Sequence, residues 1–236
     1  MSKHPLSILP VKKHNKKPEF DLPEPFLNSS GSYLITAPTR SGKSVSIINL
    51  LYNDSINFKK QFPPGNIFYI SPTVQLDDTL KAVMKDDDIV KIDDFESLDN
   101  LDTILSEIIK EQKETPEDAR EKVLIILDDC IDYLKKSKVL SNFITKNRHF
   151  LCSLIITTQS FRSVAPLIRK NVTCHLFYKM YNMKEIDAIN EEILSGFEDG
   201  LKYYKIATEK PYSFLYANCR QMELYERFEN KLWSKY

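Results

Sequence analysis

The segment Ser32-Tyr-Leu-Ile-Thr-Ala-Pro-Thr-Arg-Ser-Gly-Lys-Ser44 is the most informative stretch of this chain. It begins with a short apolar run, Ser32–Thr36, that predicts a buried strand. A tight loop ending in Gly-Lys-Ser follows, and the amphipathic pattern of Lys43–Leu51 predicts a helix directly after it. A loop of this kind between a strand and a helix is the setting in which backbone amides hold the phosphates of a nucleotide. The segment therefore predicts a nucleotide-binding phosphate loop.

The residues at the end of this loop suit the binding of ATP with Mg²⁺. Gly42 lets the backbone approach the phosphates, Lys43 places a cation against the β- and γ-phosphates, and the Ser44 hydroxyl is an expected Mg²⁺ ligand. We expect the nucleotide to contact the whole loop, which consists of Ala37, Pro38, Thr39, Arg40, Ser41, Gly42, Lys43 and Ser44. Ala37 stands where the motif G-x-x-x-x-G-K-S has its first glycine. Because alanine allows fewer backbone angles than glycine, a differently shaped turn is expected there.

Two carboxylates follow the apolar run Val123–Leu127. In a phosphate-loop protein such a strand is a Walker B element, in which Asp128 holds Mg²⁺ through water and Asp129 orients or deprotonates the attacking water. Many ATPases of this type carry glutamate at the second position, and aspartate is one methylene shorter. The alternative is that the strand simply ends in an aspartate that caps the next helix.

A third buried strand, predicted over Ser153–Thr158, ends at Gln159. If this strand lies between the strand of the phosphate loop and the Walker B strand, the Gln159 amide is near the γ-phosphate and can hydrogen-bond phosphate and water together. An inserted strand is typical of the additional-strand ATPases, which include RecA-like motors. The alternative is a glutamine that caps a loop.

Apolar runs and helical patterns alternate along the chain, which predicts an α/β fold with a mainly parallel sheet flanked by helices. We expect the RecA-like additional-strand P-loop NTPase class, with the phosphate-loop strand next to the glutamine-tipped strand and then the Walker B strand. Further strands are expected at Asn66–Ser71, Cys174–Phe177 and Ser213–Tyr216. Further helices are expected at Leu101–Lys113, Ser137–Lys146 and Lys184–Leu194, with a weak one around Thr79–Met84. The expected domains are a basic, proline-rich N-terminal arm (1–25), the P-loop ATPase domain (26–218) and a C-terminal helical tail (219–236).

Composition excludes several classes of protein. Only five glycines are present and none forms a G-x-G pattern, so a dinucleotide-binding fingerprint is excluded. The four cysteines include no C-x-x-C pair, which excludes a zinc knuckle and a disulfide scaffold and favours a reducing compartment. Neither a signal peptide nor an apolar run long enough to span a bilayer is expected, so membrane attachment is not predicted.

The formal charge of zero hides a strong asymmetry. Residues 77–129 contain 18 acidic and seven basic residues, whereas residues 133–184 contain ten Lys and Arg residues and no acid. So many cations close to a nucleotide site suggest a surface that faces DNA or charges aimed at a neighbouring subunit's phosphates. The alternative is a solvated face that lacks acids by chance. Within this stretch, Arg148 and Arg169 precede two strands and are the expected arginine fingers, although either can instead pair with a carboxylate.

The order of these motifs resembles the DNA-packaging ATPases of the FtsK–HerA superfamily, most closely the poxvirus-type enzymes of large DNA viruses and their virophages. The resemblance covers roughly residues 28–218 and rests on A-P-T-R-S-G-K-S, I-I-L-D-D, K-N-R-H-F-L-C-S-L-I-I-T-T-Q and V-A-P-L-I-R-K-N-V-T. The late strand Ser213–Tyr216 resembles the closing edge strand of that family.

The resemblance implies a homo-oligomeric ring, hexameric or pentameric, that uses ATP and Mg²⁺ to drive double-stranded viral DNA into a preformed capsid. ATP would bind between subunits and be completed by a neighbour's arginine, with Arg148 as first choice and Arg169 as second. The implied partners are duplex DNA, further copies of the chain and the capsid at its packaging vertex. The implied location is the host cytoplasm or a viral factory, with association with the virion as an option.

Three other functions compete with this interpretation. A helicase-like or recombination ATPase would share the phosphate loop, but a two-lobed helicase needs a second RecA-like domain. A small-molecule kinase would need an acceptor pocket and a lid, for which no pattern is present. A membrane-linked export ATPase would be expected to carry a transmembrane span.

Overall fold

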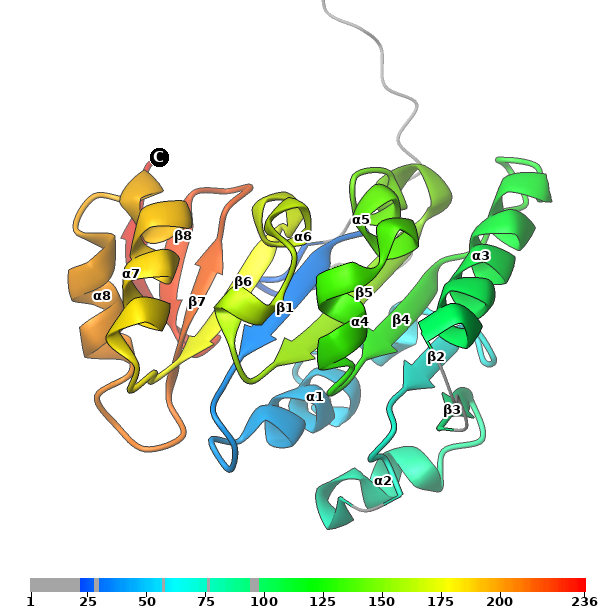
Figure 1. The fold of residues 1–236 in the computed structure, drawn as a ribbon, viewed down its shortest axis with the longest axis horizontal. Helices are drawn as coiled ribbons and strands as arrows, with labels where there is room; N and C mark the ends of the chain where they lie inside the picture. The colour runs from blue at the N-terminus through cyan, green and yellow to red at the C-terminus, as the bar shows by residue number, and fades with distance from the viewer. Residues whose placement is uncertain (1–21, 28–29, 57, 76, 94–97) are drawn as a thin grey trace, which may run out of the picture.

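The computed structural model describes residues 22–27, 30–56, 58–75, 77–93 and 98–236, and its organising element is one sheet (Figure 1). In chain order its strands are β1 (Ser32–Thr36), β2 (Ile67–Ile70), β3 (Ile89–Ile92), β4 (Val123–Leu127), β5 (Cys152–Thr158), β6 (Cys174–Tyr178), β7 (Phe214–Asn218), β8 (Glu223–Glu226) and β9 (Asn230–Ser234). Their order across the sheet is β3-β2-β4-β5-β1-β6-β7-β8-β9.

The sheet has a parallel part and an antiparallel flank. The six strands from β3 to β6 pair in parallel, whereas β7, β8 and β9 are added to β6 in antiparallel fashion. β5 lies between β1 and β4, so the strand order expected for an additional-strand ATPase is confirmed. Because parallel strands share one direction, the segments that follow β1, β4 and β5 all lie at the same edge of the sheet.

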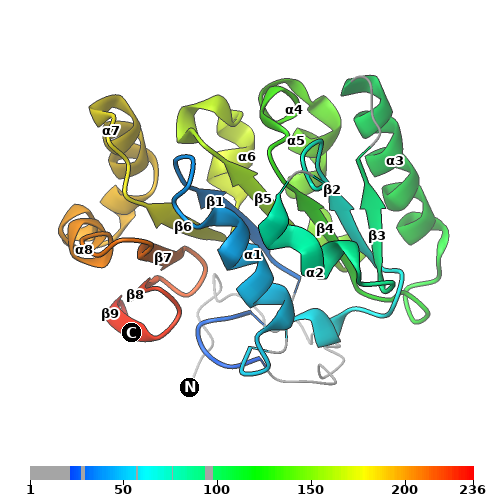
Figure 2. The ribbon, with the colours of Figure 1, turned by 90° about the horizontal axis from the view of Figure 1, so that it is seen from below.

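Helices cover both faces of the sheet. They are α1 (Lys43–Tyr52), α2 (Lys81–Met84), α3 (Leu98–Glu114), α4 (Ile131–Lys136), α5 (Lys138–Ile144), α6 (Pro166–Asn171), α7 (Met183–Glu192) and α8 (Gly200–Ala207). Figure 2 shows α3 to α7 on one face and α1 and α2 on the other, while α8 packs against β7 and β8. Local signals begin several of these helices: the Ser137 and Asn182 side chains cap α5 and α7, and Pro166 opens α6.

Burial on both faces explains why the central strands are apolar at every position. Along β4, Leu124 and Ile126 belong to the core beneath α1, whereas Val123, Ile125 and Leu127 belong to the core beneath the other helical layer. All five residues of β4 and all seven of β5 are buried. A sheet covered by helices on both sides needs such continuous apolar runs, and these runs are what made the strands predictable.

The structure corrects three expectations for the rest of the chain. The C-terminal tail, expected to be helical, forms β8 and β9 instead. β7 is therefore not the closing edge strand, because β8 pairs with its free side. β3 was not expected at all. The N-terminal arm over residues 1–25 lies outside the described residues except for 22–25.

The four cysteines are all free, and Cys130, Cys152 and Cys174 are buried. Burial raises the pKa of the Cys152 thiol to about 12, so this thiol is packed as an apolar group. In the part of the chain that the structure describes, no helix combines the length and apolar character needed to cross a membrane.

Candidate nucleotide-binding site

The phosphate loop follows β1 and leads into α1. The Ala37 amide donates to the Thr158 carbonyl at 3.0 Å, which extends the pairing of β1 with β5 by one residue. Ala37 is fully buried and is not among the residues with positive φ, so the departure from glycine at this position needs no unusual backbone. The left-handed conformation falls on Arg40 and on Gly42, whose φ of 99° suits glycine. Beyond Gly42, the first amides of α1 have no partner within the helix and can bind an anion.

A cavity of about 420 Å³ opens over this loop. Of the eight loop residues expected to contact nucleotide, it is lined by Pro38, Thr39, Arg40, Gly42, Lys43 and Ser44. Ala37 lies beneath the loop, and the Ser41 amide closes the turn by donating to the Pro38 carbonyl at 3.2 Å.

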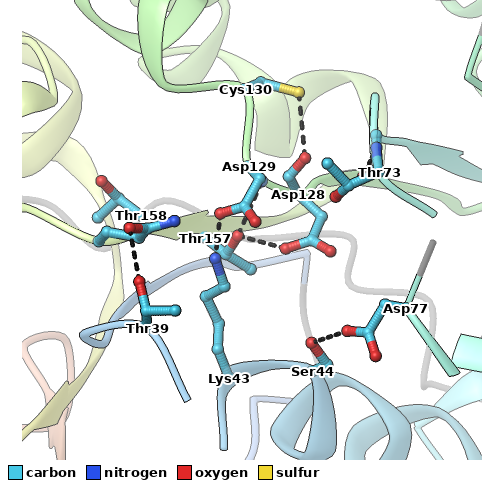
Figure 3. Close-up of polar contacts among 12 residues, drawn as sticks. Thr39, Lys43, Ser44, Thr73, Asp77, Asp128, Asp129, Cys130, Thr157 and Thr158 are labelled. Atoms are coloured by element: carbon cyan, nitrogen blue, oxygen red, sulfur yellow. Dashed lines mark hydrogen bonds and ion pairs between the residues drawn. The ribbon is translucent and has the colours of Figure 1, made fainter. Parts of the chain in front are cut away.

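Lys43 forms an ion pair with Asp129, the second carboxylate after β4 (Figure 3). The side chains are 10% and 25% exposed, so the pair is shielded from bulk water but open to the cavity. Asp129 has a φ of 56°, and its amide donates to the Thr157 hydroxyl at 3.1 Å. With this left-handed backbone the Asp129 carboxylate faces Lys43 in the phosphate loop.

Asp128 lies behind this pair and is only 2% exposed. Its carboxylate accepts hydrogen bonds from the hydroxyls of Thr157 (2.5 Å) and Tyr69 (2.8 Å). Burial raises the pKa of Asp128, and these two donors act in the opposite direction by stabilising the ionised form. The donors come from β5 and β2, the strands on either side of β4, so the sheet itself holds this carboxylate in place.

Asp77 is a site residue that the sequence analysis did not identify. Its carboxylate accepts a hydrogen bond from the Ser44 hydroxyl at 2.6 Å and another from the Thr79 amide at 2.9 Å. Partial burial opposes ionisation, but these hydrogen bonds hold the pKa of Asp77 below its ordinary value. Residues 77–129 contain many acids, and the sequence distinguishes Asp77 from the others only by its position two residues before Thr79. That spacing is typical of an aspartate that caps a turn.

The oxygen donors at this edge fit Mg²⁺. The Ser44 hydroxyl and the Asp77 and Asp128 carboxylates are hard oxygen ligands, and Mg²⁺ in nucleotide sites typically takes one or two carboxylates together with phosphate oxygens and waters. The described residues contain no group of three or more His, Cys, Asp or Glu side chains that would hold a metal alone. The Ser44 hydroxyl and the Asp77 and Asp128 carboxylates suit a metal that also takes phosphate oxygens and waters as ligands.

Gln159 lies beside the phosphate loop. The Thr39 hydroxyl donates to the Gln159 side-chain oxygen at 3.0 Å, and both residues line the cavity. Strand β5 thus brings its polar tip next to the loop after β1, as expected from their adjacent positions in the sheet.

The two expected arginine fingers have very different surroundings. Arg169 is 7% exposed, and its guanidinium contacts both carboxylate oxygens of Glu192 at 2.9 and 2.5 Å. It also donates to the Val164 carbonyl at 2.8 Å and stacks over the Phe161 ring. These contacts favour the alternative of a structural pair for Arg169, and its role as a finger stays a prediction.

Arg148 is exposed, in the short helical turn Asn147–Phe150 that precedes β5. Gln159 follows the opposite end of the same seven-residue strand. At about 3.3 Å per residue, the two ends of β5 are roughly 20 Å apart. Arg148 therefore lies at the far edge of the sheet from its own phosphate loop, and contact with ATP is open to it only across a subunit interface.

The cations of the acid-free stretch lie mainly on α4, α5, α6 and their connections, on the face of the sheet away from α1 (Figure 1). The exposed members are Lys135, Lys136, Lys138, Lys146, Arg148, Arg162, Lys170, Lys179 and Lys184. We call this set the basic layer.

The fold is similar to that of a viral NTPase. The genome packaging NTPase B204 of Sulfolobus turreted icosahedral virus 2, in complex with ATP-gammaS, superposes with a TM-score of 0.62 at 15% identity, over 85% of this chain and 98% of that one. The DNA-packaging ATPase B204 of Sulfolobus turreted icosahedral virus gives a TM-score of 0.61 at 16% identity, over the same shares. At such identities the likeness concerns the fold.

At the level of sequence, no curated protein matches the chain. Residues 26–195 match the family described as Poxvirus A32 protein. This match spans more than half of the chain and includes the phosphate loop, the Walker B carboxylates and Gln159. The chain therefore belongs to the Poxvirus A32 family.

Proposed function

We propose that this chain is an ATP-hydrolysing motor that drives double-stranded viral DNA into a preformed capsid. The observation that carries the proposal is the meeting of Lys43, Asp129 and Gln159 at one edge of the sheet, in the segments that follow three adjacent strands. Membership of the Poxvirus A32 family supports it, as does the fold shared with B204, a genome packaging NTPase.

The ion pair between Lys43 and Asp129 suggests how nucleotide prepares the site. ATP phosphates carry more negative charge than one carboxylate, so they displace Asp129 as the partner of Lys43. The freed Asp129 carboxylate then accepts a proton from water as that water attacks the γ-phosphate and ADP leaves. Gln159, held by Thr39, orients the water and the γ-phosphate.

Mg²⁺ is the expected cofactor. Ser44 would hold it directly and Asp128 through water, while Asp77 accepts a hydrogen bond from the Ser44 hydroxyl and orients its oxygen. When bound, Mg²⁺ neutralises charge on the β- and γ-phosphate oxygens.

We further propose that the motor is a homo-oligomeric ring, hexameric or pentameric, in which Arg148 of one subunit completes the site of the next. Its exposure and its distance from its own phosphate loop support action in trans. A cation aimed at the transferred phosphoryl group stabilises the charge that develops there.

Apart from Arg148, which is proposed to act on a neighbouring site, the basic layer is the proposed DNA-facing surface. Its lysines and arginines lie on neighbouring helices of one face, where a run of phosphates can be neutralised without base-specific contacts. The further proposed partner is the capsid at its packaging vertex, in the host cytoplasm or a viral factory.

The primary test is ATP hydrolysis by the whole chain with and without duplex DNA. We expect DNA to raise turnover and this increase to fall steeply with added salt. A turnover that DNA does not change, together with phosphate transfer to a small acceptor, would favour a kinase instead.

A charge-reversal pair locates the DNA contact. Lys135→Glu/Lys136→Glu, on the basic layer, is expected to reduce the stimulation by DNA. Lys60→Glu/Lys85→Glu is the matched control, because both lysines are exposed but lie outside the basic layer. Equal stimulation in the two double variants would contradict this placement.

Mixing two inactive variants tests the finger in trans. Arg148→Ala and Lys43→Ala subunits are each expected to lack turnover. In a mixed ring, an Arg148→Ala subunit keeps Lys43 and receives Arg148 from a Lys43→Ala neighbour, so some sites become complete. If mixing restores no activity, Arg148 does not act in trans.

A further inference from the structure

A second cavity, of about 480 Å³, adjoins the phosphate loop on the side of the antiparallel flank. Its walls come from α1, from the end of β6 and from the connections that flank β7 and β9, which curl round toward α1 in Figure 2. Nothing in the phosphate chemistry proposed above uses this space. Its size is within the range of small-molecule sites in proteins.

Aromatic side chains dominate this cavity. Phe26, Tyr178, Tyr212, Phe214 and Phe228 all line it. Four of these rings form a continuous cluster, with centroids 5.1 Å apart for Tyr178 and Phe214, 5.0 Å for Phe214 and Phe228, and 4.9 Å for Phe26 and Phe228. The Tyr212 ring is the exposed one and offers a flat surface that suits a planar ligand.

The two cavities share part of their lining. Gly42, Val45 and Tyr212 border both of them, so the aromatic cavity begins where the phosphate cavity ends. Val45 is 50% exposed and Tyr212 is 70% exposed. Their exposure leaves contact surface available at the junction.

Gly42 lies against the aromatic wall at this junction. A Cβ atom at Gly42 would lie 3.6 Å from the Tyr212 ring and 3.8 Å from the Tyr178 ring. The Tyr178 hydroxyl is within 2.5 Å of the Ser46 hydroxyl and donates to the Gly42 carbonyl at 3.3 Å. The aromatic wall is thus attached to the phosphate loop and to the first turn of α1.

We propose that the aromatic cavity binds the purine base of the nucleoside triphosphate, with the Tyr212 ring as its stacking surface. The inference rests on the proposed nucleotide binding and adds the part of the ligand that the motifs leave unassigned. A phosphate chain on Lys43 that continues past Gly42 and Val45 leads into this cavity. Stacking on a ring is tolerant of sequence and geometry, and Asn49 and Asn53 in the lining add amides that can hydrogen-bond a base edge.

The test compares Mg²⁺-ATP with Mg²⁺-tripolyphosphate, which has the phosphates but no base. For the unmodified chain we expect ATP to bind at least roughly tenfold more tightly than tripolyphosphate, in line with the usual contribution of base stacking. Tyr212→Ala is expected to lose roughly tenfold in ATP affinity and to keep its tripolyphosphate affinity. Tyr212→Phe, which keeps the ring, is expected to bind ATP as the unmodified chain does.

Tyr181→Ala is the matched control, because Tyr181 is 79% exposed but lines neither cavity. Equal affinity of the unmodified chain for ATP and tripolyphosphate would overturn the inference, and so would a Tyr212→Ala variant that weakens both ligands alike or neither. Failure of the unmodified chain to bind either ligand would instead overturn the proposed function, and the base site with it.

Discussion

The parallel part of the sheet and the antiparallel flank both place residues at the strand ends beside the phosphate loop, but they contribute different chemistry there. The parallel part supplies charged and amide groups, namely Lys43, Asp129 and Gln159, from the ends of adjacent strands. The flank supplies rings, with Tyr212 in the connection before β7 and Phe228 in the turn between β8 and β9.

This difference follows from strand direction. In a parallel sheet every strand ends at the same edge, so polar residues after successive strands meet without further help. In the antiparallel flank only alternate connections return to that edge, and they contribute through packing against α1. We therefore expect substitutions of the polar residues in the parallel part to change phosphate chemistry. Substitutions in a contact between helices beside the two parts should instead change stability.

The largest effect is expected for Lys43→Ala in the parallel part. Removing the cation that faces the phosphates should lower turnover by roughly a thousandfold or more and weaken ATP and tripolyphosphate alike. Turnover is measured as phosphate release at saturating ATP. Lys60→Ala, an exposed lysine outside the site, is the control and should leave turnover unchanged; equal rates in both variants would contradict the role of Lys43.

Asp129→Asn should separate chemistry from binding. Loss of the carboxylate removes the proposed base, so turnover should fall by roughly a hundredfold or more. ATP affinity should stay the same or rise, because the phosphates no longer compete with Asp129 for Lys43. Equilibrium binding and single-turnover hydrolysis check the two parts. A variant that hydrolyses normally would return Asp129 to a capping role.

Arg169→Ala tests a contact that joins the two parts. The ion pair with Glu192 connects α6, beside the parallel part, to α7, beside the flank. Removing one partner of a largely buried pair should lower the free energy of unfolding by about 3 kcal/mol. Chemical denaturation measures this loss, and the exposed Arg148→Ala should change stability by less than about 0.5 kcal/mol. Equal stability of the two variants would contradict this assignment.

The smallest expected effect is a pH dependence at His175, on the strand β6 that both parts share. Burial lowers the pKa of His175 to about 3, and the Arg169 backbone opposes this only in part. In the unfolded chain the pKa of histidine is about 6.5. Between pH 6.5 and pH 3 the unfolded state therefore binds more protons than the folded state, so the free energy of unfolding decreases as the pH is lowered through that window. Between pH 7 and pH 5 this group should remove about 2 kcal/mol from the free energy of unfolding.

Comparison with His175→Phe isolates that contribution. Phenylalanine keeps an aromatic ring against Phe177, which lies 5.1 Å from the imidazole, but it cannot be protonated. The variant should lose less stability than the unmodified chain between pH 7 and pH 5. Identical pH profiles for the unmodified chain and His175→Phe would contradict the prediction.

The central strands were predictable because helices cover both their faces. β1 and β4 have the bounds expected from the sequence, and β2, β5, β6 and β7 differ by one or two residues. β3 was missed because Ile89–Ile92 is short, contains a lysine and lies within an acidic segment at the sheet edge. The tail was expected to be helical because its two strands, β8 and β9, are partly exposed and lack a continuous apolar run.

The candidate site shows the same division. Residues that directly follow a buried strand, such as Asp128 and Gln159, could be placed because the strand order decides where they meet. Asp77 and Tyr212 could not, because each lies in a connection whose path is set by packing. The ion pair of Arg169 could not be predicted, because a sequence does not show that Glu192, on another helix, lies 2.5 Å from its guanidinium.

The amino-acid sequence by itself determined the class of fold, the phosphate loop and the acids and amide that face it, since these depend on local patterns and on the shared direction of parallel strands. Only the tertiary structure decided which arginine is exposed, which acid contacts Ser44 and where an aromatic cavity adjoins the phosphate loop. Those features arise from contacts between residues far apart in the chain, such as Arg169 with Glu192 and Ser44 with Asp77, and such contacts exist only once the sheet and its helices have packed.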